Sequence, residues 1–133
     1  YFSNWLHGDL SQYDISDPSN PKLTGQVWMG GLLGKAPIVE GIEIHGAPQM
    51  IQLSLDGARL YVTTSLLSTW DNQFYPDIRD KGGQMFLVHC DVEKGGMHLD
   101  PGFLVDFGQE PKGPARAHET RYPGGDCSSD IWI

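Results

Sequence analysis

Apolar and polar residues alternate with a period of two along two short segments near the middle of the chain, residues 49–55 and 59–65. This period is typical of β-strands, because successive side chains of a strand point to opposite faces. Asp56 and Gly57 stand between the two segments. Glycine adopts a positive φ without steric cost and aspartate tolerates left-handed geometry, so this pair favours a tight turn. The pattern predicts a β-hairpin.

Segments of the same kind occur on both sides of this hairpin. Residues 84–91 and 103–107 add two strands and complete a unit of four. Three earlier segments repeat the last three strands of that unit: 1–5, 10–15 and 23–29. Tyr1 and Tyr61 then hold equivalent positions, 60 residues apart. Repeated four-stranded units at such a spacing are typical of β-propeller blades, so we expect an all-β chain with little helix.

The phase of the repeat predicts that the chain is one piece of a larger ring. Residues 1–31 supply three strands of one blade, residues 46–107 supply a complete blade, and residues 113–133 begin the blade that closes the ring. That last unit reaches only its second strand, at 130–133, so its remaining strands must come from elsewhere. We therefore expect a C-terminal fragment of a β-propeller, amounting to roughly two blades. A self-contained β-sandwich of roughly seven to nine strands is the alternative.

Two connections between the predicted strands are long. Residues 32–45 leave room for a short strand at 38–44, and residues 66–83 read as a loop rich in aromatic side chains. Loops of this length are uncommon unless they have a function or packing of their own.

Composition excludes several classes of function. The 17 glycines and 9 prolines fit strands and turns better than helices. With 17 acidic and 9 basic residues the net charge is -8, which offers no electrostatic surface for nucleic acid and argues against binding to an anionic membrane. No apolar run approaches the roughly 18 residues of a membrane span, and residues 1–9 lack the parts of a signal peptide. The two cysteines, Cys90 and Cys127, make no disulfide framework and favour a reducing compartment.

Four runs of the sequence closely resemble one protein family, and they occur in that family's order. They are NWLHGDLSQYDISDP (4–18), PQMIQLSLDGARLYVTTSL (48–66), STWDNQFYPDI (68–78) and LVDFGQEPKGPARAHETRYPGGDCSSDIWI (104–133). The family is that of the selenium-binding proteins, whose enzymatic name is methanethiol oxidase. The resemblance covers nearly the whole chain except residues 35–47, where the connection is shortened relative to some members.

This resemblance implies a β-propeller of about seven blades, with the final residues of the chain at the family's natural C-terminus. It also implies that the family's N-terminal half is absent here, including the cysteine associated with selenium binding. Cys127 therefore does not inherit that role.

The activity that the resemblance implies is copper-dependent oxidation of methanethiol by O2 and water to formaldehyde, hydrogen sulfide and hydrogen peroxide. The partners would be a small thiol, O2 and the remaining propeller blades, without nucleic acid or integral membrane association, and the fragment alone is expected to be inactive. A cytoplasmic location is expected, with the nucleus and the membrane periphery as alternatives. The other class of function is a non-enzymatic scaffold for selenium binding or protein transport, because propellers host both classes.

Five histidines are the candidate copper ligands, since imidazole suits copper. His118 comes first, because it lies where the innermost, channel-facing strand of the last blade is expected to start. Its alternative role is to hold the ring closed through hydrogen bonds. His7 is a second candidate at a turn, where simple exposure is the alternative. Glu119 is expected to point to the opposite face of an extended segment and to support the ligand from behind.

For the remaining histidines and the cysteines, mainly structural roles are expected. His89 lies in an apolar segment, which predicts a buried, hydrogen-bonded histidine. His45 and His98 are expected to face solvent. Cys90 is expected to be buried and unreactive, whereas Cys127 lies in a polar turn as an accessible thiol, with a plain structural role as the alternative. Neither CxxC nor HExxH occurs, so any metal site must be assembled across blades.

Overall fold

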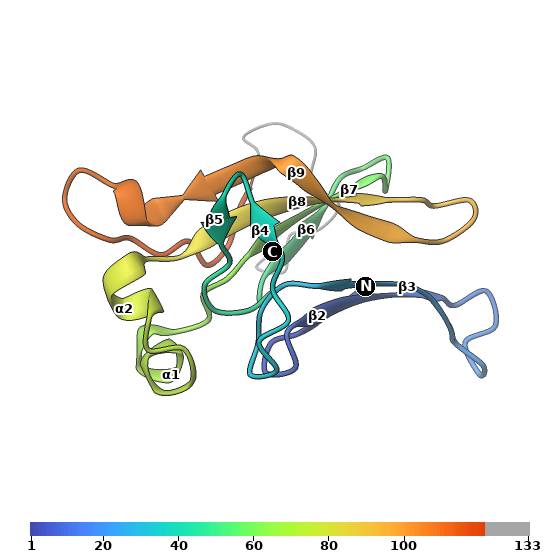
Figure 1. Cartoon of the computed structure of the whole chain (residues 1–133). Coiled ribbons are helices and arrows are strands. Elements are labelled where there is room, and N and C mark those ends of the chain that lie inside the picture. Colours follow the sequence, from blue (N-terminus) through green and yellow to red (C-terminus); the bar gives the residue numbers. More distant parts are fainter. Residues whose placement is uncertain (122–133) are drawn as a thin grey trace.

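The computed structural model describes residues 1–121 and consists mostly of antiparallel β-sheet (Figure 1). The elements in chain order are β1 (Phe2–Asn4), β2 (Asp9–Asp14), β3 (Lys22–Trp28), β4 (Ile38–Val39), β5 (Ile42–Glu43), β6 (Ile51–Leu53), β7 (Arg59–Thr63), α1 (Ser68–Phe74), α2 (Ile78–Lys81), β8 (Gln84–Cys90), β9 (Met97–Asp106) and the 3-10 helix η1 (Phe107–Gln109). The predicted strand at 130–133 lies outside this range. The expectation of a mainly β chain with little helix is confirmed for the described residues. None of their helices is long and apolar enough to cross a membrane.

Strands β6, β7, β8 and β9 form one sheet in which each strand pairs antiparallel with the next. This is the four-stranded unit that the alternation predicts. In the turn between β6 and β7, the Asp56 carboxylate accepts hydrogen bonds from Ser54 Oγ at 2.5 Å and from Ala58 N at 3.0 Å. Gly57 follows with a φ of 73°, a value that favours glycine. The predicted hairpin is confirmed.

Strands β1, β2 and β3 form a separate antiparallel sheet in the order that the repeat predicts. Strands β1 and β7 therefore lie in different sheets. This differs from a sandwich in which these two equivalent strands pair within one sheet. The connection between β3 and β6 contains a small hairpin of β4 and β5, in which Ile38 pairs with Glu43. The short strand expected in this connection is thus two short strands.

The two main sheets pack against each other, one above the other in Figure 1, and enclose the hydrophobic core. Leu10 from the smaller sheet and Phe86 from the larger sheet are both fully buried there. Burying a side chain of this size contributes about 1.5 to 3 kcal/mol each. The buried cluster consists of Leu10, Val27, Met29, Val39, Ile44, Leu60, Val62, Phe86, Val88 and Cys90.

The alternating strand directions place two kinds of connection at opposite ends of the sheets. One end, here called the loop end, gathers the connections 5–8, 29–50, 64–83 and 107–121. The other, here called the hairpin end, gathers the tight turns 15–21, 54–58 and 91–96. In Figure 1 the loop end lies to the left with α1 and α2, and two of the hairpins extend to the right.

The prediction of an irregular loop at residues 66–83 is wrong in part, because α1 and α2 form there. A buried carboxylate organises the start of α1: Asp71 accepts from Ser65 Oγ at 2.7 Å and from Leu66 N at 3.1 Å. The aromatic side chains of α1 pack against Trp5 in the first turn of the loop end. The segment therefore has packing of its own, as its length suggests.

Strand β9 begins at Met97, earlier than the strand predicted at 103–107. Pro101 and Gly102 lie between Met97 and the predicted start, and proline cannot donate to a strand ladder. The structure accommodates both residues inside the strand, where the pairing with β8 shifts register between Phe86 and Val88. A bulge of this kind leaves residues unpaired without ending the strand.

Candidate functional site

The first turn of the loop end holds a histidine beside an aspartate. His7 Nδ1 lies 2.5 Å from Asp9 Oδ1. The Asp9 side chain is 1% exposed, whereas the His7 side chain is 53% exposed. The turn is closed by Gly8, which has a φ of 94° and donates its N–H to Asn4 O at 2.6 Å. A buried carboxylate thus holds an imidazole ring whose other edge faces outward.

Several hydrogen bonds keep Asp9 ionised in its buried position. Its Oδ2 accepts from Gln26 Nε2 at 2.8 Å and from Ser11 Oγ at 3.1 Å, in addition to the contact of Oδ1 with His7. Burial raises the pKa of Asp9, but the hydrogen bonds from Gln26, His7 and Ser11 outweigh burial and hold that pKa below its ordinary value. The carboxylate is therefore an anion at neutral pH and a strong acceptor for the imidazole N–H.

The ring of His7 is also held from its face. Its centroid lies 4.8 Å from that of the Trp28 ring, at an interplanar angle of 48°. Lys35 Nζ lies 4.1 Å from the centroid of the Trp28 ring, a cation–π contact that fixes the connection 29–50 against β3. His7 is therefore restrained both at Nδ1 and at its face.

A second histidine of the loop end, His118, lies against the end of β7. Its Nδ1 is 3.0 Å from Ser65 O, and its own carbonyl oxygen accepts from Thr63 Oγ1 at 2.5 Å. These two contacts fasten the segment 107–121 to the sheet. They also leave Nε2 without a hydrogen-bond partner among residues 1–121.

The two histidines present the same edge for further binding. A carboxylate or carbonyl oxygen only accepts, so Nδ1 carries the proton in the neutral ring and Nε2 keeps its lone pair. Histidines that bind metals usually show this arrangement, with the second nitrogen donating to a carboxylate or a carbonyl. In both His7 and His118, Nε2 is therefore the nitrogen that keeps a lone pair for a further ligand. Within residues 1–121, however, no group of three or more histidine, cysteine, aspartate or glutamate side chains is placed to hold a metal ion.

Glu119, the residue expected to support His118 from behind, takes part in an ion pair. Its carboxylate pairs with Arg121, at 2.9 Å from Nη2. The group behind His118 is the Ser65 carbonyl. The neighbouring Arg116 reaches α1 instead, where its Nη1 lies 3.3 Å from Asp71 Oδ2. This ion pair joins the connections 64–83 and 107–121.

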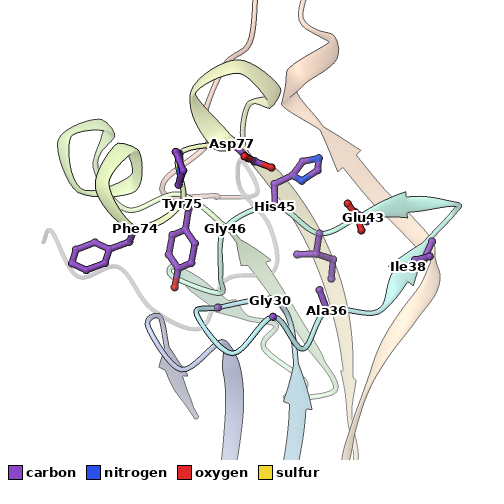
Figure 2. A pocket seen from close by; sticks show the side chains of 13 residues that line it. Gly30, Ala36, Ile38, Glu43, His45, Gly46, Phe74, Tyr75 and Asp77 are labelled. Carbon is purple, nitrogen blue, oxygen red and sulfur yellow. The ribbon is translucent and has the colours of Figure 1, made fainter.

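An open pocket of about 470 Å³ lies between the connections 29–50 and 64–83 (Figure 2). His45 lines it and is partly buried, so it is less exposed than the sequence predicts. Its backbone N–H donates to Gln84 Oε1 at 2.8 Å, which ties this part of the connection to β8. Burial lowers the pKa of His45, and the nearby Lys81 ammonium lowers it further. The imidazole in this pocket is therefore mainly neutral at neutral pH.

The wall of the pocket also contains Tyr75, labelled in Figure 2. Its hydroxyl donates to Trp5 O at 2.5 Å, and the two rings pack edge to face with centroids 5.1 Å apart. Burial, with a smaller effect from the Asp71 carboxylate, raises the pKa of Tyr75 to about 12. Tyr75 thus stays a hydrogen-bond donor that joins the two sheets at the loop end.

The other candidate side chains lie elsewhere. The prediction of a buried His89 is wrong: it is on the sheet face turned away from the core, with Nε2 2.8 Å from Asp100 Oδ2. His98 is exposed, as predicted. Cys90 is buried as predicted, and burial raises the pKa of its thiol, which disfavours the reactive thiolate. Cys127 lies outside the described residues.

Two buried carboxylates of the loop end, Asp9 and Asp71, were not predicted from the sequence. Asp9 stands two residues after His7, across the turn that Gly8 closes, and this closeness in sequence was the available signal. Asp71 lay in a segment predicted as loop, so its burial in α1 gave no signal in the sequence.

Known proteins of one family match this chain over its whole length. The sequence model of the family described as 56kDa selenium binding protein matches residues 1–133. Methanethiol oxidase of Homo sapiens is 59% identical over 150 residues, which cover 100% of this chain and 32% of that protein. Selenium-binding protein 1 of Arabidopsis thaliana is 56% identical over 150 residues, which cover 100% of this chain and 31% of that protein. The resemblance carried by the four sequence runs is confirmed.

A solved structure shares the backbone arrangement. The X-ray structure of a hypothetical selenium-binding protein from Sulfolobus tokodaii matches with a TM-score of 0.83 at 47% sequence identity, covering 100% of this chain and 28% of that chain. The chain spans about a third of the length of the curated relatives it matches.

Proposed function

Because this chain belongs to the selenium-binding protein family, we propose that the complete protein is a copper-dependent thiol oxidase. It would consume methanethiol, O2 and water and release formaldehyde, hydrogen sulfide and hydrogen peroxide. The name methanethiol oxidase, carried by a relative 59% identical over the whole chain, supports this activity. The activity is proposed for the complete protein, of which this chain would supply one part.

The proposal extends to the architecture of that protein. The two main sheets would be neighbouring blades of a β-propeller of about seven blades. Support comes from the order β6, β7, β8, β9 in one sheet and from the core that the two sheets enclose. The loop end would then form one face of the ring, with β6 nearest to the central channel.

The observation that carries the proposal is that two histidines of the loop end make the same kind of hydrogen bond. His7 and His118 both have Nδ1 held by an oxygen acceptor, and both leave Nε2 without a partner among residues 1–121. These two nitrogens would hold copper, which supplies a redox-active centre for a thiol and O2. Asp9 would orient His7 by accepting its Nδ1–H, and the Ser65 carbonyl would do the same for His118.

The test replaces each histidine in the complete protein. His118→Ala and His7→Ala should lower bound copper and turnover together by about 10 to 100-fold, the range seen when the support of a metal site is removed. Metal analysis and the release of hydrogen sulfide and hydrogen peroxide from methanethiol measure the two quantities. His98→Ala, at the hairpin end, should keep full turnover and serves as the matched control.

The outcomes separate the competing roles. Full copper and full turnover in His118→Ala would show that this residue is not a ligand, and unfolding of the variant would assign it to fastening the segment. Copper-replete wild-type protein without turnover would instead favour a non-enzymatic scaffold for selenium binding or protein transport.

A further inference from the structure

The hairpin end carries a pair of histidines that the proposed oxidase does not use. His89 on β8 and His98 on β9 are direct partners in the antiparallel register. Their rings stack with centroids 5.0 Å apart and an interplanar angle of 24°. Asp100 follows on the same strand as His98, and its Oδ2 lies 2.8 Å from His89 Nε2.

The sheet itself brings these imidazoles together. Side chains directly opposite each other on antiparallel strands share one face, with Cβ atoms about 5 Å apart. The spacing therefore does not depend on a loop conformation. The His89 side chain is 39% exposed, and His98 is also exposed. A dissolved ion can therefore reach both rings. Their face of the sheet is opposite to the one that carries Phe86 in the core.

We propose that His89 and His98 form a two-histidine clamp for a divalent transition-metal ion of the Zn²⁺ or Ni²⁺ class. Imidazole suits both ions, and water would complete the coordination. Because Asp100 holds Nε2 of His89, the clamp would use Nδ1 of that ring. The clamp has two donors, in keeping with the absence of any three-donor group among residues 1–121.

Asp100 supports the clamp in a defined way. Its Oδ1 accepts from Gly102 N at 2.9 Å, inside the irregular part of β9, while its Oδ2 faces His89. An acceptor on one nitrogen of a metal-binding histidine fixes its tautomer and raises the basicity of the other nitrogen. Asp100 is therefore a positioning residue for His89.

One neighbouring cation limits the affinity. Arg59 on β7 is the partner of His89 on its other side. A guanidinium close to a bound cation is unfavourable, but Arg59 Nη2 lies 3.4 Å from Asp56 Oδ2, toward the turn 54–58. We expect a modest affinity for the metal, which Arg59→Gln would increase.

The experiment measures Zn²⁺ binding to the complete, untagged protein at neutral pH by equilibrium dialysis, and its retention on an immobilised Ni²⁺ column. Wild-type protein should bind one Zn²⁺ that His89→Ala and His98→Ala each weaken by about tenfold or more, since the second imidazole acts at a high effective concentration. Both variants should also elute earlier from the column. His45→Ala, a histidine of the loop end, is the matched control and should behave as wild type.

These measurements test the two-histidine clamp independently of the proposed oxidase activity. Equal Zn²⁺ affinity in wild type and His98→Ala would overturn the clamp, as would a loss confined to one of the two variants. Circular dichroism of His98→Ala checks that the fold is kept, and the milder His98→Gln repeats the measurement. Methanethiol turnover should be unchanged in His98→Ala, so a failure of the oxidase proposal leaves this test intact.

Discussion

The two ends of the molecule each place a histidine beside an aspartate, but the surroundings of the carboxylates differ. At the loop end, Asp9 is 1% exposed and receives hydrogen bonds from His7, Ser11 and Gln26. At the hairpin end, Asp100 is 27% exposed and lies in an irregular part of β9. The distance between histidine and aspartate is similar in both pairs, so distance alone does not distinguish their roles.

The difference lies in how firmly each histidine is positioned. A buried carboxylate whose acceptor sites are filled has one favourable geometry, because any other would leave polar groups unpaired away from water. A carboxylate in contact with water exchanges partners at little cost. The loop end is therefore suited to chemistry that needs a fixed ligand, and the hairpin end to reversible binding of modest strength.

Glycine substitutions should show the largest contrast between the ends. A Cβ atom on Gly8 would lie 2.1 Å from Gly30 O, and the residue has a φ of 94°. We expect Gly8→Ala to lower the free energy of unfolding by about 3 kcal/mol or more, from the clash and the backbone strain together. Chemical denaturation of the complete protein measures this change.

The matched control is Gly57→Ala in the turn 54–58. Gly57 has a φ of 73°, and its added Cβ would meet only the Val92 side chain, at 3.1 Å. Only the left-handed backbone penalty of about 1 to 2 kcal/mol then applies. Equal losses in the two variants would show that the loop end is no more tightly packed than the hairpin end.

The buried carboxylate of α1 should have the next largest effect. Asp71 accepts from Ser65 Oγ and Leu66 N and pairs with the partly buried Arg116. Asp71→Asn should lower the free energy of unfolding by about 2 to 3 kcal/mol, since the arginine and the backbone N–H lose an anionic partner. Asp91→Asn, which removes an exposed turn carboxylate at the hairpin end, should shift the denaturation midpoint far less; a similar shift would contradict the comparison.

Much of the fold follows from local patterns in the sequence. The alternation around Asp56 and Gly57 predicts the central hairpin, and the repeat predicts the order of the strands in both main sheets. These predictions succeed because strand periodicity and turn chemistry are local properties. The helices at 66–83 were missed because their short length gives no helical periodicity, and their order depends on the buried Asp71 and on packing against Trp5.

The candidate site was predictable only in part. His7 and His118 stand out as histidines, but their hydrogen-bond partners depend on contacts between distant segments, as in the bond between His118 and Ser65. His89 was misassigned for a related reason. An apolar segment does not reveal which face of a strand meets the core, and the register with β9 places this residue beside His98.

A smaller effect is expected at Asp9, and it depends on pH. Its folded pKa lies below the ordinary value, so its contribution to stability is present above about pH 4 and is lost as the pH falls through the folded pKa. Asp9→Asn should therefore lower the free energy of unfolding at neutral pH by about 1 to 2 kcal/mol. The difference from wild type should shrink in acid. Unfolding curves recorded at several pH values test this, and a difference that grows toward acid would contradict the assignment.

The smallest effect on stability is expected at Asp100. The backbone N–H of Gly102, followed by His89, lowers the pKa of Asp100, yet water can replace both partners when the carboxylate is changed. Asp100→Asn should leave the denaturation midpoint at its wild-type value. The same variant should weaken Zn²⁺ binding by less than about tenfold, below the range for buried supports of metal ligands. If Asp100→Asn destabilised the protein as much as Asp9→Asn, burial would not be what separates the two histidine–aspartate pairs.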